Sequence, residues 1–189
     1  ALAEAGHEPM VQAATGLIGG ARRDARLMAG ARASALLQLM FVAMAFVALA
    51  IAYLTPDFSV ALVQAHSHST QPWPYRLAAT WGSHEGSLLL WVLILAGYGA
   101  AAALFGRRLR PTLVSRMLGV QALIAVAFLG FALFTSNPFL RLDPAPLDGA
   151  ELNPLLQDPG LVLHPPLLYL GYVGFSAAFS LAAAALIEG

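Results

Sequence analysis

The chain has 189 residues, of which 59% are hydrophobic and only 11% are charged, and its mean hydropathy is +0.71. This composition excludes an ordinary water-soluble domain, because lipid must solvate much of so apolar a surface. Ten basic residues balance ten acidic ones and there is no cysteine. The chain therefore offers no basic surface for nucleic acid, and no thiol for a disulfide, a metal site or a nucleophile.

The first apolar stretch, residues 10–20, is about half as long as a membrane crossing requires. It also contains small and polar residues that weaken a helix, namely Thr15, Gly16, Gly19 and Gly20. We predict a truncated or partial span here.

Four later segments are long enough and apolar enough to cross a bilayer core of about 30 Å, which needs roughly 20 helical residues. They are residues 35–54, 86–105, 117–135 and 167–187, with approximate bounds. The last segment follows Pro165-Pro166, which suits the first turn of a helix. The sequence thus predicts an all-α, polytopic transmembrane protein with about five spans, four complete and the first truncated.

Arginine placement predicts the orientation of these spans. All ten basic residues are arginines, and eight of them lie in the two segments 22–32 and 107–116. By the positive-inside rule both segments are cytoplasmic. Residues 55–85 and 136–166 then form two long outer loops, which hold four of the five histidines. Loops of this length are more often functional than mere connections.

The first outer motif is Trp81-Gly82-Ser83-His84-Glu85-Gly86-Ser87, at the entry to a span. One interpretation is an interfacial anchor, with a tryptophan at the membrane boundary and polar side chains facing lipid headgroups. The other is a site that binds a ligand or handles protons through His84 and Glu85. The residues alone leave both interpretations open.

The second motif runs from Asn153 to Pro166 and contains His164 directly before the two prolines. We expect a histidine just before the first turn of a membrane helix, with the backbone constrained by proline, to direct one ring nitrogen to a fixed place. That arrangement would suit an axial metal ligand. The alternative is a surface histidine that hydrogen-bonds to a loop carbonyl, and spacing does not decide between them.

Other candidate residues favour structural roles. His66 and His68 are spaced like a pair of metal ligands, but their polar surroundings favour a solvated loop. Tyr169 and Tyr172 share a helix face, which packing or interface anchoring explains. No phosphate-binding glycine loop, zinc spacing or Ser-His-Asp arrangement is present, so we assign no catalytic residue.

Two strings, WGSHEGSLLLW and LNPLLQDPGLVLHPPLLYLGYVGFS, closely resemble the CcmF family of cytochrome c maturation proteins, membrane haem lyase components of the haem-handling superfamily. Further resemblance in GGARRDARLMA, YRLAATWGSHEGS and FTSNPFLRL covers the chain from about Ala14 onward. The resemblance implies a many-span protein of the bacterial inner membrane with a tryptophan-rich WWD tract on its outer face. That tract is missing from residues 1–189, so we interpret them as the amino-terminal part of a longer protein.

The resemblance also implies roles for residues. His164 matches the family's HPP histidine, one of two axial ligands of a haem b held on the outer face, and would bind the haem iron. His84 and Trp81 are candidates for supporting contacts, and for His84 a haem-propionate contact and a local structural role both stay open. The chain would be a haem lyase component, and whether that makes it an enzyme is a matter of definition.

The resemblance implies partners as well: a periplasmic haem chaperone, other maturation subunits, and the apocytochrome c whose CxxCH thiols receive the haem. A cysteine-free chain fits a partner that supplies the thiols. Two alternatives remain. One is a paralogous haem lyase component that serves a nitrite reductase cytochrome. The other is a transporter, although transporters place polar or broken-helix sites near mid-membrane, and these spans have almost no ionisable interior residues.

Overall fold

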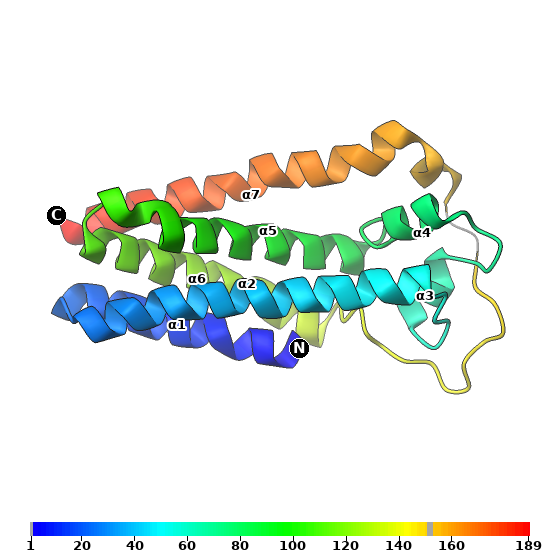
Figure 1. The fold of residues 1–189 in the computed structure, drawn as a ribbon, viewed down its shortest axis with the longest axis horizontal. Helices are drawn as coiled ribbons and strands as arrows, with labels where there is room; N and C mark the ends of the chain where they lie inside the picture. Colours follow the sequence, from blue (N-terminus) through cyan, green and yellow to red (C-terminus); the bar gives the residue numbers. More distant parts are fainter. Residues whose placement is uncertain (1, 151–152) are drawn as a thin grey trace.

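The computed structural model describes residues 2–150 and 153–189, which form a bundle of long helices with short helices at one end (Figure 1). Within these residues the α-helices are α1 (Leu2–Arg22), α2 (Ala25–Leu54), α3 (Ala61–His66), α4 (Trp73–Ala79), α5 (His84–Phe105), α6 (Pro111–Phe134) and α7 (Pro159–Glu188). Two 3-10 turns, η1 (Gly106–Arg108) and η2 (Pro154–Gln157), complete the described elements.

Four of these helices, α2, α5, α6 and α7, are long and apolar enough to cross a membrane, and they coincide with the four complete spans that the sequence predicts. The described residues contain no β-sheet, only one isolated bridge between Val60 and Arg141. These findings confirm an all-α, multi-pass membrane protein. Each helix begins before the apolar segment predicted for it, by two to ten residues.

The start of the last helix is where the sequence prediction is wrong. We expected a span from residue 167, with Pro165 and Pro166 in its first turn and the preceding residues in a loop. The structure begins α7 at Pro159 and places both prolines inside the helix. Pro159 itself occupies the first helical position, and the amide N–H of Val162 donates to the carbonyl of Asp158 at 3.0 Å. His164 therefore lies within a helix, not before one.

α1 forms a helical hairpin with α2, although α1 is not among the helices that qualify as crossing the membrane. The turn between them contains Arg23, with φ of 54°, and Asp24. The Asp24 carboxylate caps α2 by accepting hydrogen bonds from the backbone N–H groups of Arg26 and Leu27. A short polar turn thus folds α1 back along the bundle (Figure 1).

Two glycines of α1, Gly16 and Gly20, are contact points with α6. A Cβ on Gly16 would lie 2.7 Å from the Ser115 carbonyl oxygen, and one on Gly119 would lie 2.8 Å from Leu17. The Ser115 hydroxyl donates to the Gly16 carbonyl at 2.9 Å. Small residues at a helix interface let two backbones approach closely in a membrane. We name this contact the α1–α6 seam.

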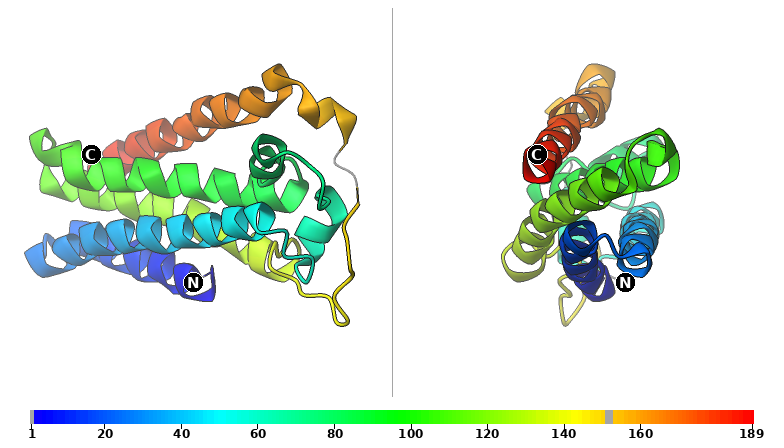
Figure 2. Two further views of the ribbon diagram at one scale, coloured as in Figure 1. Left: turned by 45° about the vertical axis from the view of Figure 1, so that its right-hand side comes forward. Right: turned by 90° about the vertical axis from the view of Figure 1, so that its left-hand side faces the viewer.

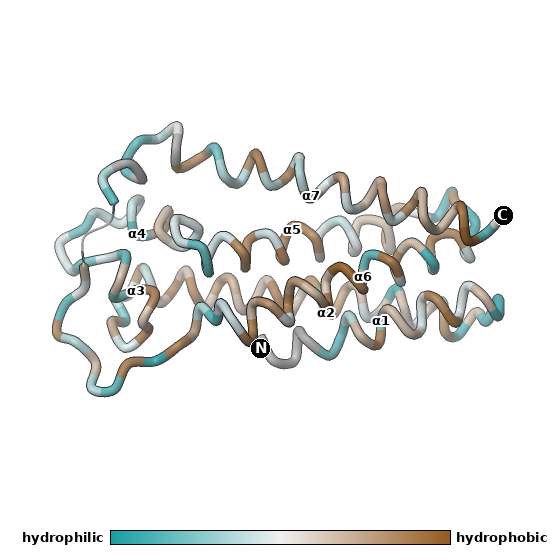
Figure 3. Tube along the Cα trace, turned by 180° about the vertical axis from the view of Figure 1, so that it is seen from behind, coloured by the Kyte–Doolittle hydropathy of each residue, from teal (hydrophilic) through white to brown (hydrophobic). Residues whose placement is uncertain are grey.

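The bundle has two different ends, seen in two further views in Figure 2. The turns α1–α2 and α5–α6 meet at what we call the arginine end, where the Arg116 guanidinium donates to the Gly20 carbonyl at 3.2 Å. The two arginine-rich segments therefore share one end, as predicted. Residues 55–83, 135–150 and 153–158 gather at the opposite end, the loop end. Hydrophilic residues concentrate toward both ends of the long helices (Figure 3).

Candidate functional site at the loop end

Hydrogen bonds at the loop end join the connection between α2 and α5 to the connection between α6 and α7. The Ser69 hydroxyl donates to Asp148 Oδ2 at 2.7 Å, and the Ser69 backbone N–H donates to Asp148 Oδ1 at 2.9 Å. These hydrogen bonds lower the pKa of the Asp148 carboxyl below its ordinary value, and the bond from the Ser69 hydroxyl has the largest effect. Arg141 and Asp57 form a second link, with 3.1 Å between Nη1 and Oδ2. The loop end is thus a folded structure built from both connections.

The two arginines outside the arginine-rich segments have partners here. The Arg76 guanidinium donates from Nε to the Gln71 carbonyl at 2.6 Å and from Nη2 to the Ser69 carbonyl at 2.7 Å. Arg141 pairs with Asp57 as described above. Both arginines therefore stabilise the loop end locally, which explains why they lie there and not in the two arginine-rich segments.

His66 and His68 each make a local contact. His66 Nδ1 lies 3.1 Å from the Leu62 carbonyl oxygen, and His68 Nδ1 lies 2.9 Å from the Thr70 hydroxyl. In the part of the chain that the structure describes, no three histidine, aspartate or glutamate side chains gather as a metal site would require. His66 is the last residue of α3 and both histidines are half-buried, which differs from the solvated loop that we expected.

The first motif is shaped by a tight turn before α5. Ser83 caps the helix, its hydroxyl accepting from the Gly86 N–H at 3.2 Å. A Cβ on Gly86 would overlap the carbonyl oxygen of Thr80, so only glycine fits. α5 consequently begins at His84, whose side chain is exposed and whose ring meets the edge of Phe131 with 6.1 Å between centroids.

His84 also stands at the mouth of an aromatic crevice between α5, α6 and α7. The crevice has a volume of about 270 Å³ and is lined by His84, Ser87, Leu88, Trp91, Phe128 and Tyr169. Trp91 is its centre, with ring centroids 5.6 Å from Phe128 and 5.4 Å from Tyr169. A smaller cavity of about 60 Å³ continues beside Trp91 and reaches Tyr172. Tyr169 and Tyr172 thus face the same side of α7, as their spacing predicts.

Trp81 connects the two sequence motifs. Its indole Nε1–H donates to the backbone carbonyl of Val162, in the first turn of α7, at 2.9 Å. The side chain is half-buried between the end of α4 and the start of α7. Sequence reasoning treated the two motifs as separate patches, and this bond brings them together.

His164 lies two residues beyond that bonded carbonyl and is exposed. Among the described residues no hydrogen bond to its ring is found, so the structure does not show the loop-carbonyl bond of the alternative interpretation. His164 is also not one of the residues that line the aromatic crevice. The structure therefore places His84 at the crevice and His164 separately on α7, with Trp81 bonded beside the latter.

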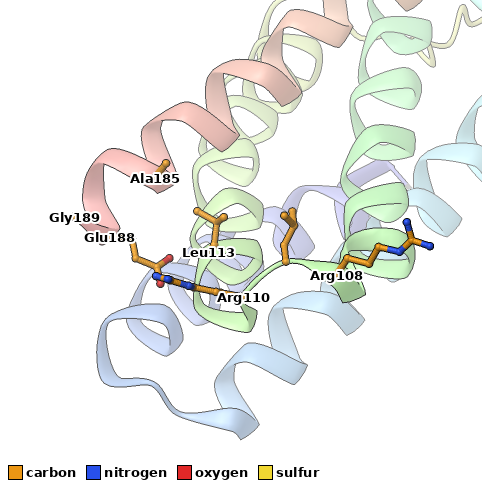
Figure 4. A pocket seen from close by; sticks show the side chains of 7 residues that line it. Arg108, Arg110, Leu113, Ala185, Glu188 and Gly189 are labelled. Atoms are coloured by element: carbon orange, nitrogen blue, oxygen red, sulfur yellow. The ribbon is translucent and has the colours of Figure 1, made fainter.

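A larger crevice, of about 370 Å³, lies at the arginine end (Figure 4), and none of its lining residues belongs to either motif. Its lining includes Arg108, Arg110 and Glu188 but no histidine. The Glu188 carboxylate accepts from the Thr112 hydroxyl at 2.6 Å and lies 3.6 Å from Arg116. These contacts fasten the end of α7 to α6, and the crevice is not the candidate site.

A family model described as "Cytochrome C assembly protein" matches residues 81–188, more than half of the chain. The chain belongs to this cytochrome c assembly family. The match begins at Trp81 and includes both motifs, so the part of the chain that defines the family is also the part that builds the crevice and carries His164.

Individual members of the assembly family agree with this assignment. The chain is 57% identical to "Cytochrome c-type biogenesis protein ccl1" of Rhodobacter capsulatus over 95% of this chain and 28% of that protein. It is 53% identical to "Cytochrome c-type biogenesis protein CcmF" of Escherichia coli over 92% of this chain and 27% of that protein. The solved structure "Cytochrome c Heme Lyase CcmF" matches with a TM-score of 0.83 and 29% identity, over 99% of this chain and 29% of that one.

These comparisons confirm the resemblance to CcmF that the two motifs indicate. They also show that the chain spans less than a third of the length of the relatives described here. The crevice, His84 and His164 therefore lie in a region that corresponds to only part of each relative.

Proposed function

We propose that this chain is the part of a cytochrome c assembly protein that supplies one axial ligand, His164, to a haem on the outer face of the bacterial inner membrane. The observation that carries the proposal is the exposure of the His164 imidazole. It is exposed and unengaged among the described residues, and it lies in the segment that defines the family.

The residues present fit one half of a haem site. Neutral imidazole is a good ligand for haem iron. We expect the second axial ligand to come from elsewhere in a full-length protein, because this chain spans less than a third of the length of its relatives. A haem b held in this way would supply the vinyl groups to which the two thiols of a CxxCH sequence add, each S–H adding across one C=C bond.

The chain's own contribution is to hold and orient. At the loop end α7 diverges from the other long helices (Figure 1), and the exposed His164 lies in this first part of α7, where other proteins could reach it. His84 gives a supporting contact instead of an iron–nitrogen bond, because its ring packs against Phe131 at the crevice. Trp81 supports His164 from the preceding turn through Val162.

The proposal includes a location and partners. With the arginine end in the cytoplasm, the loop end faces the periplasm, where a haem chaperone delivers haem and other maturation subunits present apocytochrome c. A reporter that is active only in the periplasm should work when fused near Ser69 and fail when fused near Arg110. The opposite result would refute this orientation.

The family assignment favours this function over a transporter. A haem lyase component dedicated to a nitrite reductase cytochrome would use the same two motifs, so the role proposed for His164 applies equally to such a paralogue.

The test is substitution of His164 in the full-length protein. His164→Ala should remove the bis-histidine haem spectrum and stop production of c-type cytochrome, and added imidazole should partly restore both. His68→Ala is the matched control, because His68 is another loop-end histidine with a local partner. A normal spectrum and normal maturation in His164→Ala would refute the proposal.

A separate variant tests the role of His84. His84→Ala should lower the cytochrome yield while haem stays bound, because only a supporting contact is lost. Loss of haem as complete as in His164→Ala would show instead that His84 is itself a ligand.

A further inference from the structure

The carbonyl of Val162 occupies an unusual position in α7. In an α-helix the carbonyl of residue i accepts from the N–H of residue i+4. For Val162 that residue is Pro166, which has no N–H and whose ring pushes the carbonyl away from the helix axis. The Trp81 indole N–H supplies a donor at 2.9 Å. Pro166 therefore leaves the Val162 carbonyl without its helical donor, and Trp81, far away in the sequence, supplies one.

The start of α7 is held by few buried contacts among the described residues, and the next side-chain hydrogen bond along the helix is from the Tyr98 hydroxyl to the Leu170 carbonyl at 2.9 Å. None of the described side chains between Pro159 and Leu168 is buried. Only 17% of the crossing segment of α7 is buried in the bundle, compared with 50% for α5. The first part of the helix also runs in a different direction from the rest (Figure 2). A segment with exposed side chains and missing helical donors opens easily, so a single tertiary bond has a large share in holding it.

Trp81, by contrast, belongs to a well-fixed turn. Its backbone N–H donates to the Ala78 carbonyl at 3.2 Å, and the next N–H, that of Gly82, donates to the Ala79 carbonyl at 3.1 Å. Ala79 and Thr80 are completely buried, and the Thr80 carbonyl fills the space beside Gly86. The indole therefore projects from a rigid base.

We propose that Trp81 is the positioning residue for His164: its indole N–H replaces the donor that Pro166 lacks and fixes the proline-interrupted turn that carries the imidazole. The link to His164 as a haem ligand rests on the proposed function, whereas the link between Trp81 and Pro166 does not.

The first experiment measures this turn without reference to haem. In the full-length protein in lipid nanodiscs, amide hydrogen exchange of residues 163–170 should be about three- to tenfold faster in Trp81→Phe, which keeps an apolar ring but loses one hydrogen bond. Trp73→Phe is the matched control, because Trp73 is 65% exposed, and should leave these amides unchanged. Unchanged exchange in Trp81→Phe would overturn the proposal.

A double-mutant cycle identifies the cause. Pro166→Ala restores a backbone N–H four residues after Val162, so Trp81→Phe should accelerate exchange much less in this background than in the natural one. Equal acceleration in both backgrounds would show that Trp81 acts through ring packing and would overturn the hydrogen-bond mechanism.

The haem-loaded full-length protein completes the test. Trp81→Phe should retain haem but broaden its low-spin electron paramagnetic resonance signal, because the imidazole adopts a range of orientations, and Pro166→Ala should narrow that signal again. Accelerated exchange with an unaltered haem signal would reduce Trp81 to a structural role. If His164→Ala leaves the haem intact, the proposed function fails, while the exchange result still decides whether Trp81 fixes the turn.

Discussion

α6 contacts α1 on one side and α7 on another, and the two contacts are built in different ways. Toward α1 the backbones nearly touch: a Cβ on Gly16 would lie 2.8 Å from the Cα of Gly119. Toward α7, Trp91 of α5 contacts both Phe128 of α6 and Tyr169 of α7, with ring centroids 5.6 and 5.4 Å apart, and the aromatic crevice lies between the three helices. One contact is a backbone seam and the other is a set of aromatic spacers.

The difference indicates that α1 is fixed tightly to α6, whereas α7 is less constrained. Between helices in lipid, close packing and hydrogen bonds must replace the hydrophobic effect as the source of association. The α1–α6 seam has both, with Gln12 Nε2 donating to the Leu118 carbonyl at 2.9 Å in addition to the Ser115 bond. α7 accepts side-chain hydrogen bonds from Trp81, Tyr98 and Thr112, but only 17% of its crossing segment is buried in the bundle. It is also the helix that carries the proposed haem ligand.

The largest expected effect comes from breaking the seam. Gly119→Leu would drive a side chain into the backbone of α1, and we expect a loss of about 3 kcal/mol in the free energy of unfolding. Gly130→Leu on the same helix is the matched control, because nothing lies within 4 Å of a Cβ there. Thermal unfolding of the full-length protein in detergent measures both variants. Equal stability of the two would show that the seam is not a tight contact.

A smaller effect is expected on the aromatic side. Trp91→Ala removes the ring between Phe128 and Tyr169, and we expect it to cost about 1–2 kcal/mol, because the crevice already leaves one face of the ring uncovered. The loss should appear chiefly as faster amide exchange in α7. Phe175→Ala, at an exposed position of α7, should change little. A Trp91→Ala loss as large as that of Gly119→Leu would contradict the distinction between the two contacts.

The helix positions show how much could be predicted from sequence alone. Hydropathy and length identify the four crossing helices, and arginine placement identifies which turns share an end. Gly16 and Gly20 were assessed by helix propensity, a local property, and their tertiary role in the seam has no local signal. The start of α7 was placed too late because the double proline imitates a helix start, whereas Pro159 begins the helix.

The candidate site was predictable to a similar degree. The motifs and their histidines stand out by composition at the loop end. The Trp81–Val162 bond does not, because it joins residues 81 positions apart, although a proline within a helix does signal a carbonyl in need of a donor. The crevice depends on three helices meeting and could not be read from any one of them.

The smallest expected effect is the pH dependence of amide exchange at the loop end. This region lies outside both helix contacts. The folded-state pKa of Asp148 is below its ordinary value of 3.8, because Ser69 donates two hydrogen bonds to the ionised carboxylate. The stabilisation is therefore complete above pH 3.8 and is lost as the pH falls through the lower, folded-state value. Loop-end amide exchange, corrected for its intrinsic pH dependence, should increase there.

Asp148→Asn provides the control for this measurement, since an amide accepts a hydrogen bond but does not titrate in this range. Exchange in this variant should show no such increase, and the α1–α6 seam should be unaffected in either protein. An identical acid response in the natural protein and the Asp148→Asn variant would mean that the carboxylate does not hold the two connections together.

The most direct test of the central claim, that His164 is bound to haem iron, is to change the chemical identity of the ligand. In the full-length protein, His164→Cys should replace an imidazole with a sulfur ligand, and the absorption and electron paramagnetic resonance spectra of the ferric haem should change from a bis-imidazole to a thiolate-imidazole type. The same substitution at His84 should leave the bis-imidazole spectrum in place. An unaltered bis-imidazole spectrum in His164→Cys would contradict the account, because the iron would then take both of its ligands from other residues.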